Sequence, residues 1–214
     1  MYSIIFKLFI ALGLVGCSSE QSKVKQPSFK FTNINLEQLD NNGNKQFSFT
    51  TKKAEIVEIS KSLTAKEPVL IFYQGNKPYY KIQSNKASLI NNGQLITLKN
   101  KVTMQSINNT NLNLLTDLIK WDKDNSRAEL SGSIISRING SMFRSSKAVY
   151  DHTNNTIEFI GIKKFTFSDK SLSKTIKVKA DKAIWYANQN RLYFSSNDSQ
   201  VRTSIDFSDI LKNL

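Results

Sequence analysis

Cys17, the only cysteine of the 214-residue chain, is the side chain best placed for covalent chemistry. It follows Gly16 at the end of the apolar run Leu8–Val15, and Lys7 precedes that run. A positive charge, roughly 7–15 apolar residues and a small residue at the cleavage point are typical of a secretory signal. A cysteine directly after that point is typical of a bacterial lipoprotein. We therefore predict cleavage before Cys17, acylation of the new N-terminus and retention of the chain at a membrane.

Two other interpretations of this segment stay open: a plain secretory signal, and an uncleaved anchor beside a buried thiol. Residues 1–16 are too few for a bilayer-spanning helix, which needs roughly 20 residues. One acyl chain gives only marginal membrane binding, so a stable anchor needs a second signal.

The remaining side chains with catalytic or metal-binding potential are scattered. His152, the only histidine, falls in a predicted turn, where we expect it to be solvated. One histidine and one cysteine do not make a His/Cys zinc set within one chain. Asp117, Asp122 and Asp124 lack the spacing of a calcium loop, and no GxSxG, SxxK or glycine-rich phosphate loop is present. We predict that the protein is not an enzyme and needs no cofactor.

The net charge of +13 is spread along the chain without a block of five or six like charges. Such a distribution gives a general attraction to anionic surfaces rather than a nucleic-acid-binding arm. Anionic lipids and polyanionic saccharides are therefore the expected partners, and nucleic acid is not. The alternative is that lysines on solvent-facing strands keep an edge-rich sheet soluble.

Paired strands recur with a period of about 30 residues. Each copy begins at a small apolar residue, places a larger one two positions later, and crosses a polar turn such as Asn92-Gly93 into a second strand. Alternation of apolar and polar residues with period two predicts half-buried antiparallel strands. We expect an all-β stack of hairpins around one apolar interior. Only Leu36–Leu39 and Phe207–Leu214 could be helical, and both are short. The anchor positions of the copies are Ala54, Ala87, Leu118, Ala148 and Ala183.

The segment Pro27–Ile56 resembles the start of the LptC family, the membrane-anchored component of lipopolysaccharide export. It has the aromatic-rich strand Phe29–Ile34, the turn Asp40–Gly43 and the strand Phe47–Ala54. The segments AELSGSII and IEFIGIKK resemble the repeat shared by LptC, LptA and OstA-like proteins. The resemblance covers nearly all of the mature chain.

The sequence departs from the family pattern at two points. Family members often keep an uncleaved transmembrane helix, whereas this chain has the lipoprotein pattern. Asn100 and Ser196 also stand where glycine is common.

The resemblance implies an antiparallel sheet folded into an open β-jellyroll, or β-taco, around an apolar groove for acyl chains. Lipopolysaccharide or a related glycolipid would arrive from inner-membrane ABC transporter permease subunits and pass to an LptA-type periplasmic bridge protein. The joints between these proteins would form by strand addition at sheet edges. The expected location is the periplasm, with a lipid anchor in the inner rather than the outer membrane. The alternative is a scaffold lipoprotein of an envelope assembly, with a filled core and no ligand.

If the resemblance holds, small anchors leave room for acyl chains and larger neighbours form the walls. The expected groove residues are Ala54, Ile56, Ile71, Ala87, Leu89, Ile96, Leu98, Val102, Met104, Leu118, Leu130, Ile134, Ala148, Tyr150, Ile157, Phe159, Ala183 and Trp185. The expected partner edges carry Phe29 and Phe31 at one end and Leu192 and Phe194 at the other. The expected division is a signal peptide at 1–16, a polar tether at 17–27, one β-jellyroll domain at 28–207 and a tail at 208–214.

Overall fold

The computed structural model describes residues 28–57, 62–107, 112–139, 141–162, 164–169, 174–197 and 201–206. Within these residues the chain forms a 16-stranded sheet in which every pairing is antiparallel, so the all-β prediction is confirmed. The strands are β1 (Ser28–Leu39), β2 (Lys45–Val57), β3 (Ser62–Lys66), β4 (Val69–Gln74), β5 (Lys77–Gln83), β6 (Lys86–Ile90), β7 (Leu95–Ser106), β8 (Leu112–Asp122), β9 (Arg127–Ile138), β10 (Ser141–Asp151), β11 (Thr156–Ile160), β12 (Lys164–Asp169), β13 (Lys174–Lys179), β14 (Lys182–Tyr186), β15 (Arg191–Ser195) and β16 (Arg202–Asp206). Short 3-10 helices, η1 (Asn91–Gly93) and η2 (Ala187–Gln189), occupy two of the turns.

The prediction that Leu36–Leu39 could be helical is wrong. These residues end β1, where Leu36 pairs with Phe49 of β2. Phe207–Leu214, Cys17 and the segments 1–16 and 17–27 lie outside the described residues.

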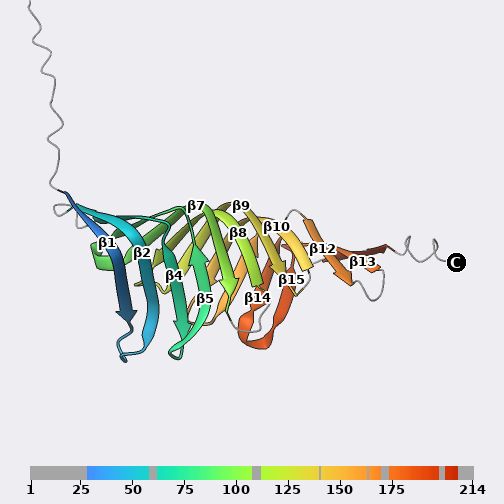
Figure 1. The fold of residues 1–214 in the computed structure, drawn as a ribbon. Helices are drawn as coiled ribbons and strands as arrows, with labels where there is room; N and C mark the ends of the chain where they lie inside the picture. Colours follow the sequence, from blue (N-terminus) through green and yellow to red (C-terminus); the bar gives the residue numbers. More distant parts are fainter. Residues whose placement is uncertain are drawn as a thin grey trace, which may run out of the picture.

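The sheet is folded into two arms that share their long strands. Arm A has the strand order β1–β2–β4–β5–β7–β8–β9–β10–β12–β13–β16, and arm B has the order β1–β2–β3–β6–β7–β8–β9–β10–β11–β14–β15. The long strands β1, β2 and β7–β10 run through both arms, and the remaining strands belong to one arm each. The strands lie side by side along an elongated molecule, with β1 at one end and β12 and β13 toward the other (Figure 1).

The line along which the strands pass from one arm to the other is called the crease here. Side chains alternate between faces along a strand, so one extra residue exchanges the faces. On β8, Thr116 and Ile119 are both buried, while Asp117 and Leu118 between them point outward. The pairing registers shift between Leu115 and Leu118 on β8, and equivalent shifts occur on β7 and β10. The bulges therefore let both arms turn their apolar side chains toward the same interior.

Polar side chains complete the backbone hydrogen bonding where the bulges interrupt the ladder. Asp117 Oδ2 accepts a hydrogen bond from the Ser133 backbone N–H at 3.0 Å. Thr116 Oγ1 donates to the Ser131 carbonyl oxygen at 2.8 Å. Gly132 has φ +100°, and a Cβ at this position would clash with the Asp117 carboxylate. The crease at β8 and β9 therefore needs a glycine both for its backbone conformation and for space.

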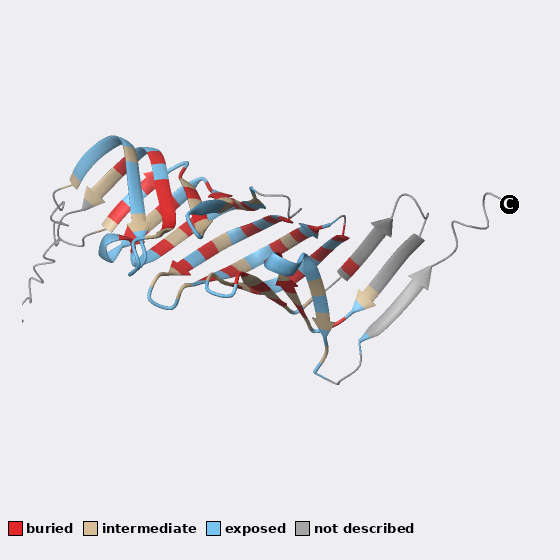
Figure 2. Ribbon diagram, turned by 90° about the horizontal axis from the view of Figure 1, so that it is seen from below, coloured by how far each residue is buried: buried red, intermediate tan, exposed pale blue. Residues whose placement is uncertain are grey.

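The inner face of arm B carries the repeat anchors in one row. Ala54, Ala87, Ala148 and Ala183 are buried in this row. In the third copy the pairing places Ile119 in the row, opposite Leu98 and Leu130, so the predicted anchor Leu118 is one residue off. The cause is the crease bulge, which turns Leu118 to the outer face. Along the strands, buried residues alternate with more exposed ones (Figure 2).

Candidate lipid-binding interior

The space between the arms is filled by large side chains. Both tryptophans are fully buried there, together with Tyr80 and Tyr150. Most of the predicted groove residues lie in this core. Ile56 is partly buried against it, and all others except Ile71 and Leu118 are buried. The two arms thus enclose a packed apolar interior in this structure.

Two predicted groove residues are on the wrong face. Ile71 lies between the buried side chains of Leu70 and Phe72, so alternation turns it outward. Leu118 points outward at the crease. The interior also contains residues that the sequence analysis did not name, mainly from arm A. Among them are Phe47, Phe49, Leu70, Phe72, Tyr80, Ile82, Leu112, Leu114 and Phe143 of arm A, with Ile119 and Trp121 of arm B.

Opposite the crease, the free ends of the two arms meet along a line called the seam here. Phe72 of arm A is fully buried against rings of arm B. Its ring centroid lies 4.6 Å from that of Trp121, 5.6 Å from that of Tyr150 and 5.7 Å from that of His152. Phe47, also from arm A, adds an edge-on contact to Trp121 at 6.4 Å. Aromatic packing therefore closes the side of the fold that lies opposite the crease, where the two arms would otherwise be open.

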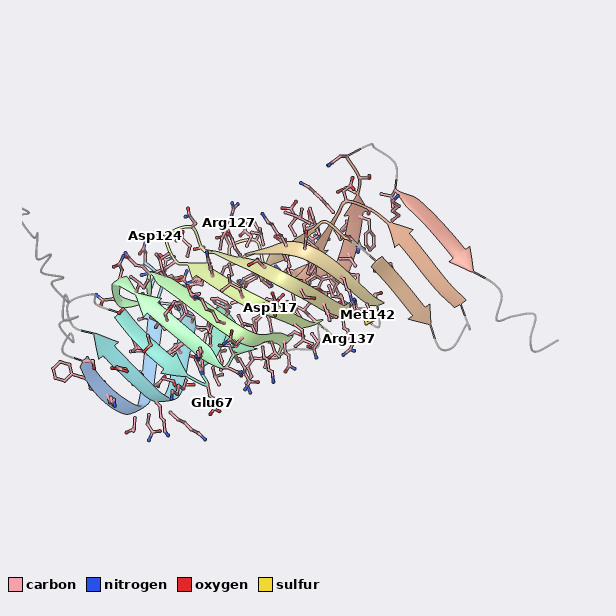
Figure 3. The ribbon with its side chains drawn as sticks, turned by 90° about the horizontal axis from the view of Figure 1, so that it is seen from above. Glu67, Asp117, Asp124, Arg127, Arg137 and Met142 are labelled. Carbon is pink, nitrogen blue, oxygen red and sulfur yellow. The ribbon has the colours of Figure 1, made fainter. Side chains whose placement is uncertain are left out.

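Hydrogen bonds between the arms reinforce the seam at three places along its length. Gln74 Nε2 donates to the His152 carbonyl oxygen at 2.6 Å. Gln46 Nε2 donates to Ser126 Oγ at 3.4 Å. Farther along, Asn139 Nδ2 donates to Asn190 Oδ1 at 2.9 Å. In Figure 3, Asp124 and Arg127 mark the turn end of β8 and β9, away from Asp117 at the crease.

His152 is part of the seam, which corrects the expectation of a solvated turn histidine. It does lie in the turn after β10, but its ring packs against Phe72, Trp121 and Tyr150. Its Nδ1 is 3.1 Å from Tyr150 Oη. Burial lowers the pKa of His152, and the negative charges of Asp151 and Asp40 oppose that shift only in part. His152 is therefore neutral at physiological pH.

Seven buried side-chain polar atoms make no hydrogen bond with the described residues, among them Tyr80 Oη, Trp121 Nε1 and Trp185 Nε1 in the interior. Burial raises the pKa of Tyr80 well above its usual value, so the phenol stays protonated. A buried polar group without a partner costs about 1–3 kcal/mol. The interior is thus apolar over most of its area, with a few donors that a bound molecule can satisfy.

The two ends of arm B are open edges. Strand β1 pairs only with β2, and its Phe29 and Phe31 are 52% and 44% exposed. Strand β15 pairs only with β14. Its Leu192 and Phe194 face inward and are partly buried, and Phe194 stacks edge-on against Phe165 at 4.7 Å. The exposed aromatic side chain of β15 is instead Tyr193.

No group of three or more His, Cys, Asp or Glu side chains among the described residues could hold a metal ion. The helices in the described part of the chain are also too short and too polar to cross a bilayer.

Comparison with known proteins places the chain in a family. No curated protein sequence matches significantly. Among solved structures, the chain is similar to LptH, the LptA homologous periplasmic component of the lipopolysaccharide transport device from Pseudomonas aeruginosa. The match has a TM-score of 0.40 and 13% identity and covers 85% of this chain and 96% of LptH. The sequence model of the family described as lipopolysaccharide-assembly, LptC-related, matches residues 7–129. The chain therefore belongs to the LptC-related family and has a role in lipopolysaccharide transport.

Proposed function

We propose that the protein binds the acyl chains of lipopolysaccharide between its two arms and passes them along its length. The observation that carries the proposal is that two rows of paired inner residues run from one open edge to the other without a charged side chain. The first row is Phe31, Ala54, Ala65, Ala87, Leu98, Ile119, Leu130, Ala148, Phe159, Ala183 and Phe194. The second is Phe29, Ile56, Leu63, Leu89, Ile96, Trp121, Ala128, Tyr150, Ile157, Trp185 and Leu192.

An apolar path that reaches both edges suits a carrier better than an isolated pocket does. An acyl chain can move along it without crossing a polar barrier. Each buried methylene contributes about 0.8 kcal/mol, so a chain of roughly a dozen methylenes contributes about 10 kcal/mol. That gain is large enough to offset the opening of a seam held by a few ring contacts and hydrogen bonds.

The packed interior means that binding requires a change of shape. The arms must separate at the seam, and the core side chains must move apart to admit acyl chains. A ligand can drive such a change only through its preference for the open form. The unpaired donors at Tyr80, Trp121 and Trp185 would gain partners if ester or hydroxyl oxygens of the glycolipid entered.

The edges supply the proposed points of transfer. We assign β1 to the periplasmic part of the ABC transporter permease subunits and β15 to an LptA-type bridge protein, since an unpaired strand can be extended by another chain. An acylated Cys17 with the tether 17–27 would hold the β1 end at the inner membrane. The domain then spans 28–207, and the protein carries out no catalysis.

A scaffold lipoprotein with no ligand is the second candidate, and the filled interior is the observation in its favour. Photocrosslinking to lipopolysaccharide in cells distinguishes the two. A photoreactive residue is placed in turn at Leu98, Phe159 and Trp185, with the exposed outer position Lys120 as control, because Lys99 lines a hollow on the outer surface. Capture at the inner positions and not at Lys120 supports transport through the interior. A folded protein that captures nothing at any inner position would instead be a scaffold.

A further inference from the structure

The outer face of arm B carries four lysines that stand directly opposite one another. Lys53 of β2 pairs with Lys66 of β3, Lys66 with Lys86 of β6, and Lys86 with Lys99 of β7. All four are exposed and lie beside the crease. Like charges directly opposite across antiparallel strands are destabilising. This set, called the lysine ladder here, is therefore an arrangement that folding alone does not favour.

The ladder forms no ion pair with the described residues, and Glu55 is the one acidic residue among the five lysines that line the same hollow. Among the described residues, none of its four lysines lies within ion-pairing distance of a carboxylate; the three ion pairs formed are Lys45–Glu37, Arg127–Asp151 and Lys182–Glu158. In the described part of the sheet, lysines that stand directly opposite one another in this register occur only at this end of the outer face. Continuing the same register through β8–β11 and β14 gives Leu118, Ser131, Lys147, Ile160 and Lys182, so no two lysines are adjacent there.

The ladder lines a hollow on the outer surface of about 730 Å³. Lys30 of β1 lines it too, and the hydroxyl groups of Thr64, Ser88 and Thr97 stand along it. Ammonium groups as point charges together with hydroxyl donors are suited to phosphate oxygens. The polar lining comes from side chains that alternate with the inner row, and Phe31, Ala54, Ala65 and Ala87 of that row also border the hollow.

We propose that the lysine ladder docks on the phosphate headgroups of anionic phospholipids in the membrane that holds the protein. The docking goes beyond the proposed transport function and does not depend on acyl chains entering the interior. The position of the ladder supports a membrane as its partner. It borders β1, the first strand, and the tether 17–27 spans at most ~40 Å, so an anchor at Cys17 keeps this end near the bilayer.

Docking would give the anchor its second signal. A lipid anchor combined with a basic surface binds a membrane more stably than either alone. Lysines near an anionic membrane surface strengthen membrane binding without a specific binding site. This attraction falls off within about a Debye length of the surface. The ladder would therefore fix which side of arm B faces the bilayer, whereas a flexible tether alone would leave it free to rotate.

The test is residue-resolved acetylation of lysines in the full processed chain, reconstituted in vesicles and read by mass spectrometry. Vesicles of phosphatidylcholine are compared with vesicles that also contain phosphatidylglycerol. We expect the four ladder lysines to react about fivefold more slowly in the anionic vesicles, and this protection to disappear at high salt. Lys120 and Lys147, exposed on the outer face beyond the hollow, should react equally in both.

Two matched double variants sharpen the test. Lys66→Gln with Lys86→Gln should remove the protection of Lys53 and Lys99. Lys120→Gln with Lys147→Gln makes the same change in net charge and should leave that protection intact. Equal rates in both kinds of vesicle, or equal protection of Lys120 and Lys147, would overturn the proposal. So would protection that appears only after lipopolysaccharide is added, which would assign the ladder to the transported glycolipid. Because these vesicles lack lipopolysaccharide, the result is separate from the photocrosslinking test of transport.

Discussion

Replacing Phe72 by leucine tests whether the seam controls entry to the interior. Leucine keeps an apolar side chain at this fully buried position but removes the ring contacts to Trp121, Tyr150 and His152. Each aromatic contact contributes about 0.5–1.5 kcal/mol beyond its buried area. The interplanar angles of 55°, 49° and 44° are neither stacked nor edge-to-face, so we take the low end, about 1.5–2.5 kcal/mol in total.

A loss of this size shifts the balance between closed and open seam by about twelve- to sixtyfold, since 1.4 kcal/mol is a factor of ten. If acyl chains enter only through an open seam, their association rate should rise by a similar factor. The assay is stopped-flow fluorescence with lipopolysaccharide. The only two tryptophans, Trp121 and Trp185, are both buried in the interior and report entry without a label.

The control is Leu130→Ala, a buried position of arm B beside the crease. It should lower the free energy of unfolding by about 2–5 kcal/mol without weakening the seam, so the association rate should not rise. The reasoning is refuted if Phe72→Leu destabilises the protein but leaves the association rate unchanged. It is equally refuted if Leu130→Ala accelerates association as much.

Three further predictions concern His152, the crease and the edges. Because burial lowers the pKa of His152 in the folded state, the unfolded chain binds its proton more readily, and stability falls as pH drops below the ordinary value of 6.5. Urea unfolding between about pH 8 and about pH 5 should show this loss in the wild type and much less of it in His152→Gln; identical curves would contradict it. Gly132→Ala should cost more stability than Gly43→Ala in thermal unfolding. Both glycines have positive φ, but only at Gly132 would the Cβ meet Asp117. Phe194→Pro should abolish binding to the bridge protein and spare the transporter contact, and Phe31→Pro should do the reverse, because proline blocks strand addition at one edge only; loss of both contacts in either variant, with melting unchanged, would refute the assignment.

The sequence predicted the hairpins and the alanines of arm B because both depend on local patterns. A turn such as Asn92-Gly93 and alternation along one strand need no knowledge of the neighbouring strand. The sequence did not predict the crease, because a bulge is recognised only from the pairing with the neighbouring strand. Period-two alternation resumes after the bulge, but with the inward and outward positions exchanged. In the sequence, a bulge of the crease corresponds to two or three consecutive outward-facing residues between buried ones, such as Lys52-Lys53.

Ile71 and His152 show two other limits of local reasoning. Ile71 lies in the run VLIFYQ, where every neighbour is apolar or aromatic and alternation does not identify a face. His152 lies in a polar turn, as predicted, but that turn packs against Phe72, 80 positions earlier in the chain. Only the closure of the two arms brings these residues together, so no local pattern identifies the seam.

The distribution of side-chain size between the crease and the seam indicates how the packed interior would open under the proposed function. Five of the eleven residues in the inner row next to the crease are alanines: Ala54, Ala65, Ala87, Ala148 and Ala183. The rings of Phe72, Trp121 and Tyr150 pack together at the seam. In a fold hinged at the crease, displacement grows with distance from the hinge, so the large side chains move farthest. At the bulges of the crease, Asn100, Lys101 and Gly132 have positive φ values and the pairing register shifts. A small rotation there would separate Phe72 from Trp121 while leaving the contacts beside the crease intact. Under the proposed function, the same sequence would close over itself when empty and admit acyl chains when lipopolysaccharide is present.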